Sequence, residues 1–419
     1  MPLECADMVT IIKRHGLDDI AEKVEAGERL SYEDGVTLYA SRDVHEIGRL
    51  ANVVRERLHG NVAYYNINRH INYSNFCVLR CKFCSFYRPY TKDRAEPGDE
   101  RSMSSDVGMQ GRIGLPLLGA AQDDAYELSV DQIVDQAKRA YEAGATEVHI
   151  VGGLHPKLSF SYYLDLCRHI RATCPNIHIK AFTAIEIIHF TRITKPRLSI
   201  RGVLEQLREA GLGSLPGGGA EIFDDRVHEE AYRAKVGEQG WFDVHRTAHE
   251  LGIYSNVTML YGHIESREER ITHMLKLREH QDESLRHRRA AFNCFIPLSF
   301  IPEGSELGHL SGPTGLDDLK TLAISRLMLD NIPHIKAFWP MQSAKLAQVS
   351  LNWGVDDIDG TVIYYDITKR EGGHGNRHQE LGVDQIRSLI REAGRIPVER
   401  DTLYRRVARN DDTQVHGAL

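Results

Sequence analysis

Three closely spaced cysteines, Cys77, Cys81 and Cys84, constrain this chain more than any other feature. They lie in the stretch INYSNFCVLRCKFCSFYR at residues 71–88, and their spacing is C-x3-C-x2-C. A structural zinc site or an ordinary iron–sulfur cluster normally has four protein ligands. The other cysteines are remote in the sequence: Cys5, Cys167, Cys174 and Cys294. Three thiolates on a cubane cluster leave one iron open to a further ligand, so the spacing favours a reactive cluster. The alternatives are a surface zinc knuckle or three unrelated thiols.

Composition narrows the class of protein. The 419 residues are 42% hydrophobic and 26% charged, which is ordinary for a globular protein. A net charge of −7 and a pI near 6.3 argue against a nucleic-acid partner. No apolar run is long enough to predict a membrane span, and the first residues lack the apolar core of a signal peptide. Seven cysteines, three of them clustered, fit a reducing cytoplasm better than a disulfide framework, so we expect a cytoplasmic protein.

The order of predicted elements divides the chain into three parts. Residues 1–60 are charged and amphipathic, which predicts a helical lead-in. Residues 61–365 alternate strands with helices, and the first strand is expected at residues 62–75. Residues 92–125 show no clear period, and we expect a flexible insertion there. Residues 366–419 are expected to form a C-terminal extension with one helix.

This alternation is typical of βαβ units and a parallel sheet. About eight such units predict an α/β fold, a (β/α)8 TIM-type barrel with helical N- and C-terminal extensions. The runner-up is a partial barrel of six strands with extensions. In a parallel barrel, site residues gather where strands end and helices begin.

Several candidate site residues follow predicted strands. Gly152 and Gly153 end the strand at 147–151, and two glycines allow the backbone to approach a ligand closely. Thr183 and Glu186 lie on or just after the next predicted strand, at 177–184. Glu186 is interpreted either as a hydrogen-bonding partner of a ligand hydroxyl or as a cap of the following helix.

Histidines near predicted strand ends could form a pocket with proton-transfer capacity near neutral pH. They are His70, His155, His189, His263 and His334. For any one of them a structural hydrogen bond is the simpler interpretation. We select His70, His263 and Glu186 as candidate catalytic residues. Basic residues that could hold a carboxylated substrate are Arg69, Arg80, Arg88 and Lys336.

The three cysteines, with Phe83 before the last of them, resemble the radical S-adenosylmethionine (SAM) superfamily. The resemblance implies a [4Fe–4S] cluster bound by Cys77, Cys81 and Cys84, whose open iron chelates SAM. It also implies that Gly152 and Gly153 bind the SAM amino group and that Phe83 shields the cluster and stacks on adenine. Thr183 and Glu186 are the expected partners of the rest of the cofactor, with Glu186 on the ribose.

A narrower resemblance extends over most of residues 30–400. The segments VGGLHPKLSFSYYLDL, HIKAFTAIEI, LGSLPGGGAEIF and VHRTAHELGIYSNVTMLYGHIE are similar to the aminofutalosine synthase family of menaquinone biosynthesis. In that family the 5'-deoxyadenosyl radical adds to 3-[(1-carboxyvinyl)oxy]benzoate. Aryl migration and decarboxylation then give 6-amino-6-deoxyfutalosine, so SAM is consumed as a co-substrate. The resemblance therefore implies a radical SAM transferase that acts on a carboxylated enol ether.

Three other functions stay open at this stage. The chain could be a dehypoxanthine futalosine cyclase, a deazaflavin-forming radical SAM enzyme, or a non-catalytic iron–sulfur sensor. An enzyme of this kind needs a reductant such as flavodoxin or ferredoxin. A homo-oligomer is a further possibility that the sequence does not test.

Overall fold

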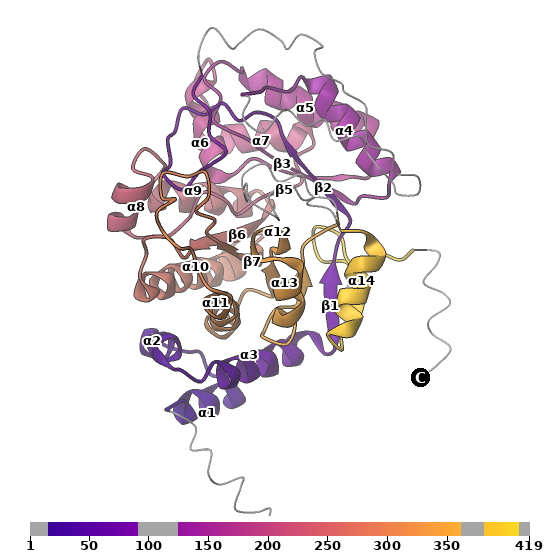
Figure 1. The fold of residues 1–419 in the computed structure, drawn as a ribbon. Coiled ribbons are helices and arrows are strands. Elements are labelled where there is room, and N and C mark those ends of the chain that lie inside the picture. Colours follow the sequence, from indigo (N-terminus) through magenta and orange to yellow (C-terminus); the bar gives the residue numbers. More distant parts are fainter. Residues whose placement is uncertain (1–15, 91–124, 362–380, 410–419) are drawn as a thin grey trace, which may run out of the picture.

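A computed structural model describes residues 16–90, 125–361 and 381–409 (Figure 1). Its strands form one sheet in the order β10-β1-β9-β8-β7-β6-β5-β4-β3-β2, and every pairing within it is parallel. The strands are β1 (Val62–Tyr65), β2 (Asn68–Asn72), β3 (Glu147–Val151), β4 (His178–Ala181), β5 (Ser214–Leu215), β6 (Tyr254–Tyr261), β7 (Phe292–Ser299), β8 (His334–Ala337), β9 (Asp357–Ile358) and β10 (Ile396–Glu399). The sheet curls into a partial barrel, which confirms the predicted α/β fold of the TIM type, although its described strands number ten and not eight.

Helices alternate with these strands, as the βαβ pattern predicts. They are α1 (Asp18–Ala26), α2 (Tyr32–Ala40), α3 (Val44–His59), α4 (Val130–Glu142), α5 (Phe160–Thr173), α6 (Ala184–Ile193), α7 (Ile200–Ala210), α8 (Asp225–Ala231), α9 (Glu238–Glu250), α10 (Arg267–His287), α11 (Gly315–Met328), α12 (Trp339–Gln342), α13 (Ala344–Ser350) and α14 (Val383–Glu392). Alternate apolar side chains of sheet and helices form one continuous buried core. No described helix is long and apolar enough to cross a membrane.

The strand expected at residues 62–75 is two strands on opposite sides of the sheet. β1 pairs with β9 and β10, whereas β2 pairs with β3. Asn66 and Ile67 separate the two strands. After this break, β2 is the edge strand beside β3, at the other side of the sheet from β1. The prediction of one strand was wrong because the apolar pattern continues through the break. The expected insertion at 92–125 lies outside the described residues, apart from its last residue.

Helices α1, α2 and α3 lie together at one end of the molecule (Figure 1). Ser31 and Asp34 cap α2 reciprocally, so the N-terminal segment has a defined start signal. Helix α3 packs against α11, and Gly48 of α3 faces the ring of Trp353 so closely that a Cβ atom there would lie 2.7 Å from it. The helical lead-in is therefore fastened to the barrel.

The C-terminal segment adds a strand to the sheet besides its one predicted helix. β10 pairs with β1, and α14 lies beside them (Figure 1). Beyond β10, Thr402 donates a hydrogen bond of 2.7 Å to Glu147 at the start of β3. Arg409 donates one of 2.8 Å to the carbonyl of Gly144. The chain after β10 thus bridges the two edges of the sheet.

Candidate active site

The loop that follows β2 carries the three cysteines, and backbone hydrogen bonds give it its shape. The Cys77 amide donates to the Arg88 carbonyl at 3.1 Å, and the Cys84 amide donates to the Cys81 carbonyl at 3.0 Å. The Val78 amide donates to the Leu154 carbonyl at 3.0 Å, which joins this loop to the one after β3. The cysteine loop therefore lies at the C-terminal edge of the parallel strands, where barrel enzymes place their sites.

The three thiols belong to one short loop beside a cavity. All three side chains are half-buried, and Cys81 and Cys84 line a cavity of about 430 Å³. Three thiolates are the donor set of an iron–sulfur cluster with one open iron, and a small ligand can reach two of them through the cavity.

Gly152 and Gly153 allow the cysteine loop to pack directly on the end of β3. A Cβ atom at Gly152 would lie 2.6 Å from the Tyr73 ring, and one at Gly153 would overlap the carbonyl oxygen of Phe76. The same Cβ at Gly153 would lie 3.1 Å from the Cβ of Cys77. The two glycines are therefore required by the position of the metal-binding loop, whatever they also offer a ligand.

Thr183 and Glu186 form a capping box at the start of α6, as one of the two interpretations expected. The Glu186 carboxylate accepts hydrogen bonds from the Thr183 amide at 2.7 Å and the Tyr73 hydroxyl at 2.7 Å. It also accepts one from the Gly152 amide at 3.3 Å. Burial raises the pKa of Glu186 to about 7, although these hydrogen bonds oppose the rise. One buried carboxyl group thus links the loops after β2, β3 and β4.

A buried ion pair lies beside the cysteine loop, and the sequence analysis did not select it. The Lys235 ammonium pairs with the Glu221 carboxylate and lies 5.0 Å from the centre of the Phe83 ring. Phe83 is half-buried against the core, and its role in shielding the cluster stays a prediction. Lys235 follows α8, far from the cysteines in sequence, so no motif or spacing connects it to them.

His70 lies in the middle of β2, inside the barrel. Its ring centre is 4.4 Å from that of His149, and its Nε2 is 3.8 Å from the Asp359 carboxylate. Burial lowers the pKa of His70 to about 4, and Asp359 opposes that shift. His70 is therefore a neutral side chain below the level of the cysteine loop, and its predicted catalytic role stays a prediction.

His263 lies two residues after β6, near the expected strand end. Its Nε2 lies 3.1 Å from the Leu260 carbonyl and its Nδ1 lies 3.4 Å from the Glu265 carboxylate. Glu265 pairs in turn with Arg270 at 2.8 Å. Burial lowers the pKa of His263, so a neutral imidazole is held in a fixed orientation. This position suits a positioned acid or base, and the role stays a prediction.

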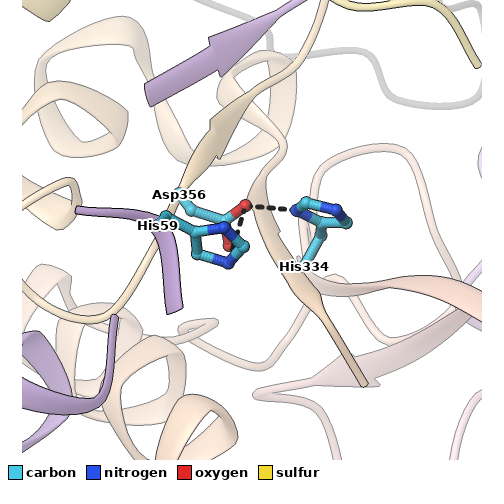
Figure 2. A group of neighbouring side chains, drawn as sticks. All are labelled: His59, His334 and Asp356. Atoms are coloured by element: carbon cyan, nitrogen blue, oxygen red, sulfur yellow. Dashed lines mark hydrogen bonds and ion pairs between the residues drawn. The ribbon is translucent and has the colours of Figure 1, made fainter. Parts of the chain in front are cut away.

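The structure places His334 at the N-terminal ends of the parallel strands, away from the loops that follow them. It begins β8, where it donates from Nδ1 to the Asp356 carboxylate at 2.6 Å (Figure 2). His59, the last residue of α3, lies 3.6 Å from the same carboxylate and 2.9 Å from the Pro333 carbonyl. Arg326 binds the other oxygen of Asp356 at 2.6 Å. The two imidazoles and the Arg326 guanidinium all contact the Asp356 carboxylate, so Arg326 already supplies its cation. We therefore assign these four residues to the stability of the barrel base, which is the end of the barrel where the strands begin.

The four basic candidates have different surroundings. Arg80 is exposed and pairs with Glu306 at 2.7 Å, and Arg88 donates to the Ser85 carbonyl at 3.0 Å within the cysteine loop. Lys336 is buried and pairs with Asp359 at 2.9 Å. Arg69 is buried on β2. The structure therefore does not bring the four together as a carboxylate site.

The fold and the three-cysteine loop define a class of enzyme. The profile described as Radical SAM superfamily matches residues 71–277, and the CofH/MqnC C-terminal region matches residues 289–412. The chain is a radical SAM enzyme, a class that uses a [4Fe–4S] cluster and SAM. Methylornithine synthase, a solved structure, superposes with a TM-score of 0.64 over 90% of this chain and 97% of its own, at 18% identity, which supports the fold.

Sequence relatives narrow the class to a family. The chain is 46% identical to aminodeoxyfutalosine synthase of Thermus thermophilus over 93% of this chain and 95% of the relative. It is 32% identical to cyclic dehypoxanthine futalosine synthase of Halalkalibacterium halodurans over 95% of this chain and 97% of the relative. The chain belongs to the aminodeoxyfutalosine synthase family, which confirms the family predicted from its segments.

Proposed function

We propose that this enzyme joins the 5'-deoxyadenosyl group of SAM to 3-[(1-carboxyvinyl)oxy]benzoate and forms 6-amino-6-deoxyfutalosine. The adenosyl carbon bonds to the vinyl carbon of the substrate, the aryl group moves from oxygen to carbon, and the vinyl carboxylate is lost. The observation that carries the proposal is the identity of 46% with an aminodeoxyfutalosine synthase along almost the whole chain. The lower identity of 32% with the cyclic dehypoxanthine futalosine synthase favours the synthase reaction over the cyclase reaction.

The bound cluster and SAM supply the adenosyl radical, and the chain supplies their surroundings. Cys77, Cys81 and Cys84 are the proposed cluster ligands, since their thiols share one half-buried loop beside a cavity. A cavity of this kind leaves room for a ligand next to the thiols, which a three-cysteine cluster site requires.

The loops after β3 and β4 are the proposed cofactor site. Gly152 and Gly153 bring backbone groups beside Cys77, where they can meet the SAM amino group. Thr183 and Glu186 follow β4, and Glu186 lies close enough to Gly152 to share a hydrogen bond with its amide. Because both Glu186 oxygens already accept hydrogen bonds, a contact with ribose would be additional to these or would replace one of them.

The acid–base roles of His70 and His263 are part of the same proposal. Burial lowers the pKa of both imidazoles, so each is a neutral group and a weak proton acceptor in a site from which water is excluded. His263 follows its strand end and is the better placed of the two. A flavodoxin or ferredoxin is the proposed electron donor, and the proposed location is the cytoplasm, where low-potential donors and reduced thiols occur together.

Product analysis tests the proposal. The full-length enzyme is reconstituted with iron and sulfide without oxygen, reduced with dithionite, and supplied with SAM and the enol-ether acid. The expected result is a product with the mass of 6-amino-6-deoxyfutalosine, which the Cys77→Ala variant does not form. Free 5'-deoxyadenosine without that product would retain the radical SAM class and contradict the substrate. No SAM cleavage by an enzyme with a full cluster would favour the sensor alternative.

A further inference from the structure

We infer that Lys235 is the buried cation that sets the reduction potential of the iron–sulfur cluster, and that Glu221 holds it in place. The inference depends on the cluster that the radical SAM class uses, and it is independent of the proposed substrate. Lys235 would then act through the cluster, as a positioning charge and not as a catalytic residue.

Two contacts fasten the segment around Lys235 to the cysteine loop. The Lys235 ammonium lies 5.0 Å from the centre of the Phe83 ring, and Phe83 stands between Cys81 and Cys84. The Lys82 amide donates a hydrogen bond of 2.9 Å to the Ala231 carbonyl, at the end of α8. The cation is therefore held beside the part of the loop that carries two of the three thiols.

This cation is shielded from water. The side chain of Lys235 is 11% exposed and that of Glu221 is 8% exposed. A buried charge acts through a low effective dielectric and is little screened by salt, whereas an exposed charge is weakened by water. Arg80 provides the comparison, since it directly precedes Cys81 but its side chain is 73% exposed and pairs with Glu306.

The positive member of the ion pair lies towards the metal-binding loop. The Lys235 ammonium lies over the Phe83 ring, and Phe83 stands between Cys81 and Cys84. The Glu221 carboxylate pairs with the same ammonium. The pair is thus neutral as a whole, and its cation is the member in contact with Phe83.

The sign of the effect follows from charge. A cluster that has accepted one electron carries one more negative charge than the oxidised cluster. A nearby cation stabilises the reduced form more, and charge near the cluster is one of the factors that set its potential. Lys235 should therefore raise the potential, and its removal should make the cluster harder to reduce.

A redox titration of the reconstituted, full-length enzyme tests the inference. The EPR signal of the reduced cluster is followed against potential without SAM and without substrate, so the result does not depend on the proposed reaction. Lys235→Met is expected to disfavour reduction at least tenfold, which lowers the midpoint potential by about 59 mV for one electron. Lys235→Arg should restore most of this loss, because it keeps the charge. Glu221→Gln should shift the potential upward, and the exposed control Arg80→Met should leave it unchanged.

Two results would overturn the inference. The first is an unchanged potential in Lys235→Met with a full iron content, and weaker binding of radiolabelled SAM by that variant would then assign the cation to the SAM carboxylate. If Lys235→Met fails to fold or to take up iron, Glu221→Gln decides, and a potential that does not rise in Glu221→Gln is the second.

Discussion

The hydroxyl of Tyr73 donates a hydrogen bond of 2.7 Å to the buried carboxylate of Glu186. Tyr73 directly follows β2 and Glu186 lies in the first turn of α6, so the bond ties the start of the cysteine loop to the loop after β4. The residues proposed to contact SAM lie on the segments that follow β2, β3 and β4, and this bond joins the first of these segments to the last.

Tyr73→Phe removes this hydrogen bond and keeps the ring. The free energy of unfolding should fall by about 1–3 kcal/mol, since a buried acceptor loses a strong donor. Denaturation with urea measures the loss. Tyr39→Phe is the matched control, because its buried hydroxyl makes a longer contact of 3.3 Å with Thr321. A Tyr73 variant no less stable than the control would contradict the role of the bond.

Gly153→Ala should prevent correct placement of the cysteine loop. The new methyl group would overlap the Phe76 carbonyl, and relief of such overpacking costs about 1–3 kcal/mol or more. We expect a clear loss of iron and sulfide per chain after anaerobic reconstitution. Gly237→Ala is the control, since nothing lies within 4 Å of a Cβ there. Equal iron contents in both variants would show that the loop does not need the glycine.

His273 should make the protein less stable in acid. Its Nδ1 accepts from the Phe223 amide at 3.2 Å while its Nε2 lies 3.0 Å from the Thr258 carbonyl, so the ring fits only as a neutral tautomer. Burial lowers its pKa to about 3, whereas an unfolded histidine titrates near about 6.5. Below about pH 6.5 the unfolded chain binds a proton at His273, whereas the folded chain does not. The stability that this group contributes is therefore complete above about pH 6.5 and declines as the pH falls towards about 3. The decline reaches about 1.4 kcal/mol per pH unit for this group.

Urea denaturation at several pH values measures that slope. His273→Gln should reduce it by up to about 1.4 kcal/mol per pH unit. Other buried histidines, including His280, still contribute to the pH dependence of the free energy of unfolding. His287→Gln, at the exposed end of the same helix, should leave the slope as it is. The same slope in both variants would refute the assignment to His273.

Asp356→Asn should destabilise the barrel base strongly. Arg326 is fully buried against this carboxylate, and a buried charge that loses its partner costs about 3–5 kcal/mol. Asp165→Asn, in an exposed pair with Arg168, should cost less than about 1 kcal/mol. Thermal or urea denaturation compares the two. Similar losses would mean that the base of the barrel does not depend on the network around Asp356.

Local signals in the sequence predicted local structure well. The strands expected at residues 147–151 and 177–184 are present as β3 and β4. Such features depend on a short apolar run within one element. Fold class followed from the alternation of strands and helices for the same reason.

The sequence did not predict contacts between residues that are far apart in the chain. Lys235 meets Phe83 only because α8 folds against the cysteine loop, and no spacing encodes that contact. His334 was expected with the other histidines, but it is the first residue of β8 and so lies at the N-terminal ends of the parallel strands. The hydrogen bond from Tyr73 to Glu186 is of the same kind, because it joins residues 113 positions apart in the chain.

The most direct test of the central claim follows the adenosyl carbons of SAM. Uniformly carbon-13-labelled adenosyl SAM is supplied with unlabelled enol-ether acid to the reduced enzyme, and the products are resolved by mass spectrometry. If the radical adds to the substrate, the complete label appears in a product that also contains the aryl carbons. If the radical only abstracts hydrogen, the label appears in 5'-deoxyadenosine and in no larger product, and the proposed function is wrong.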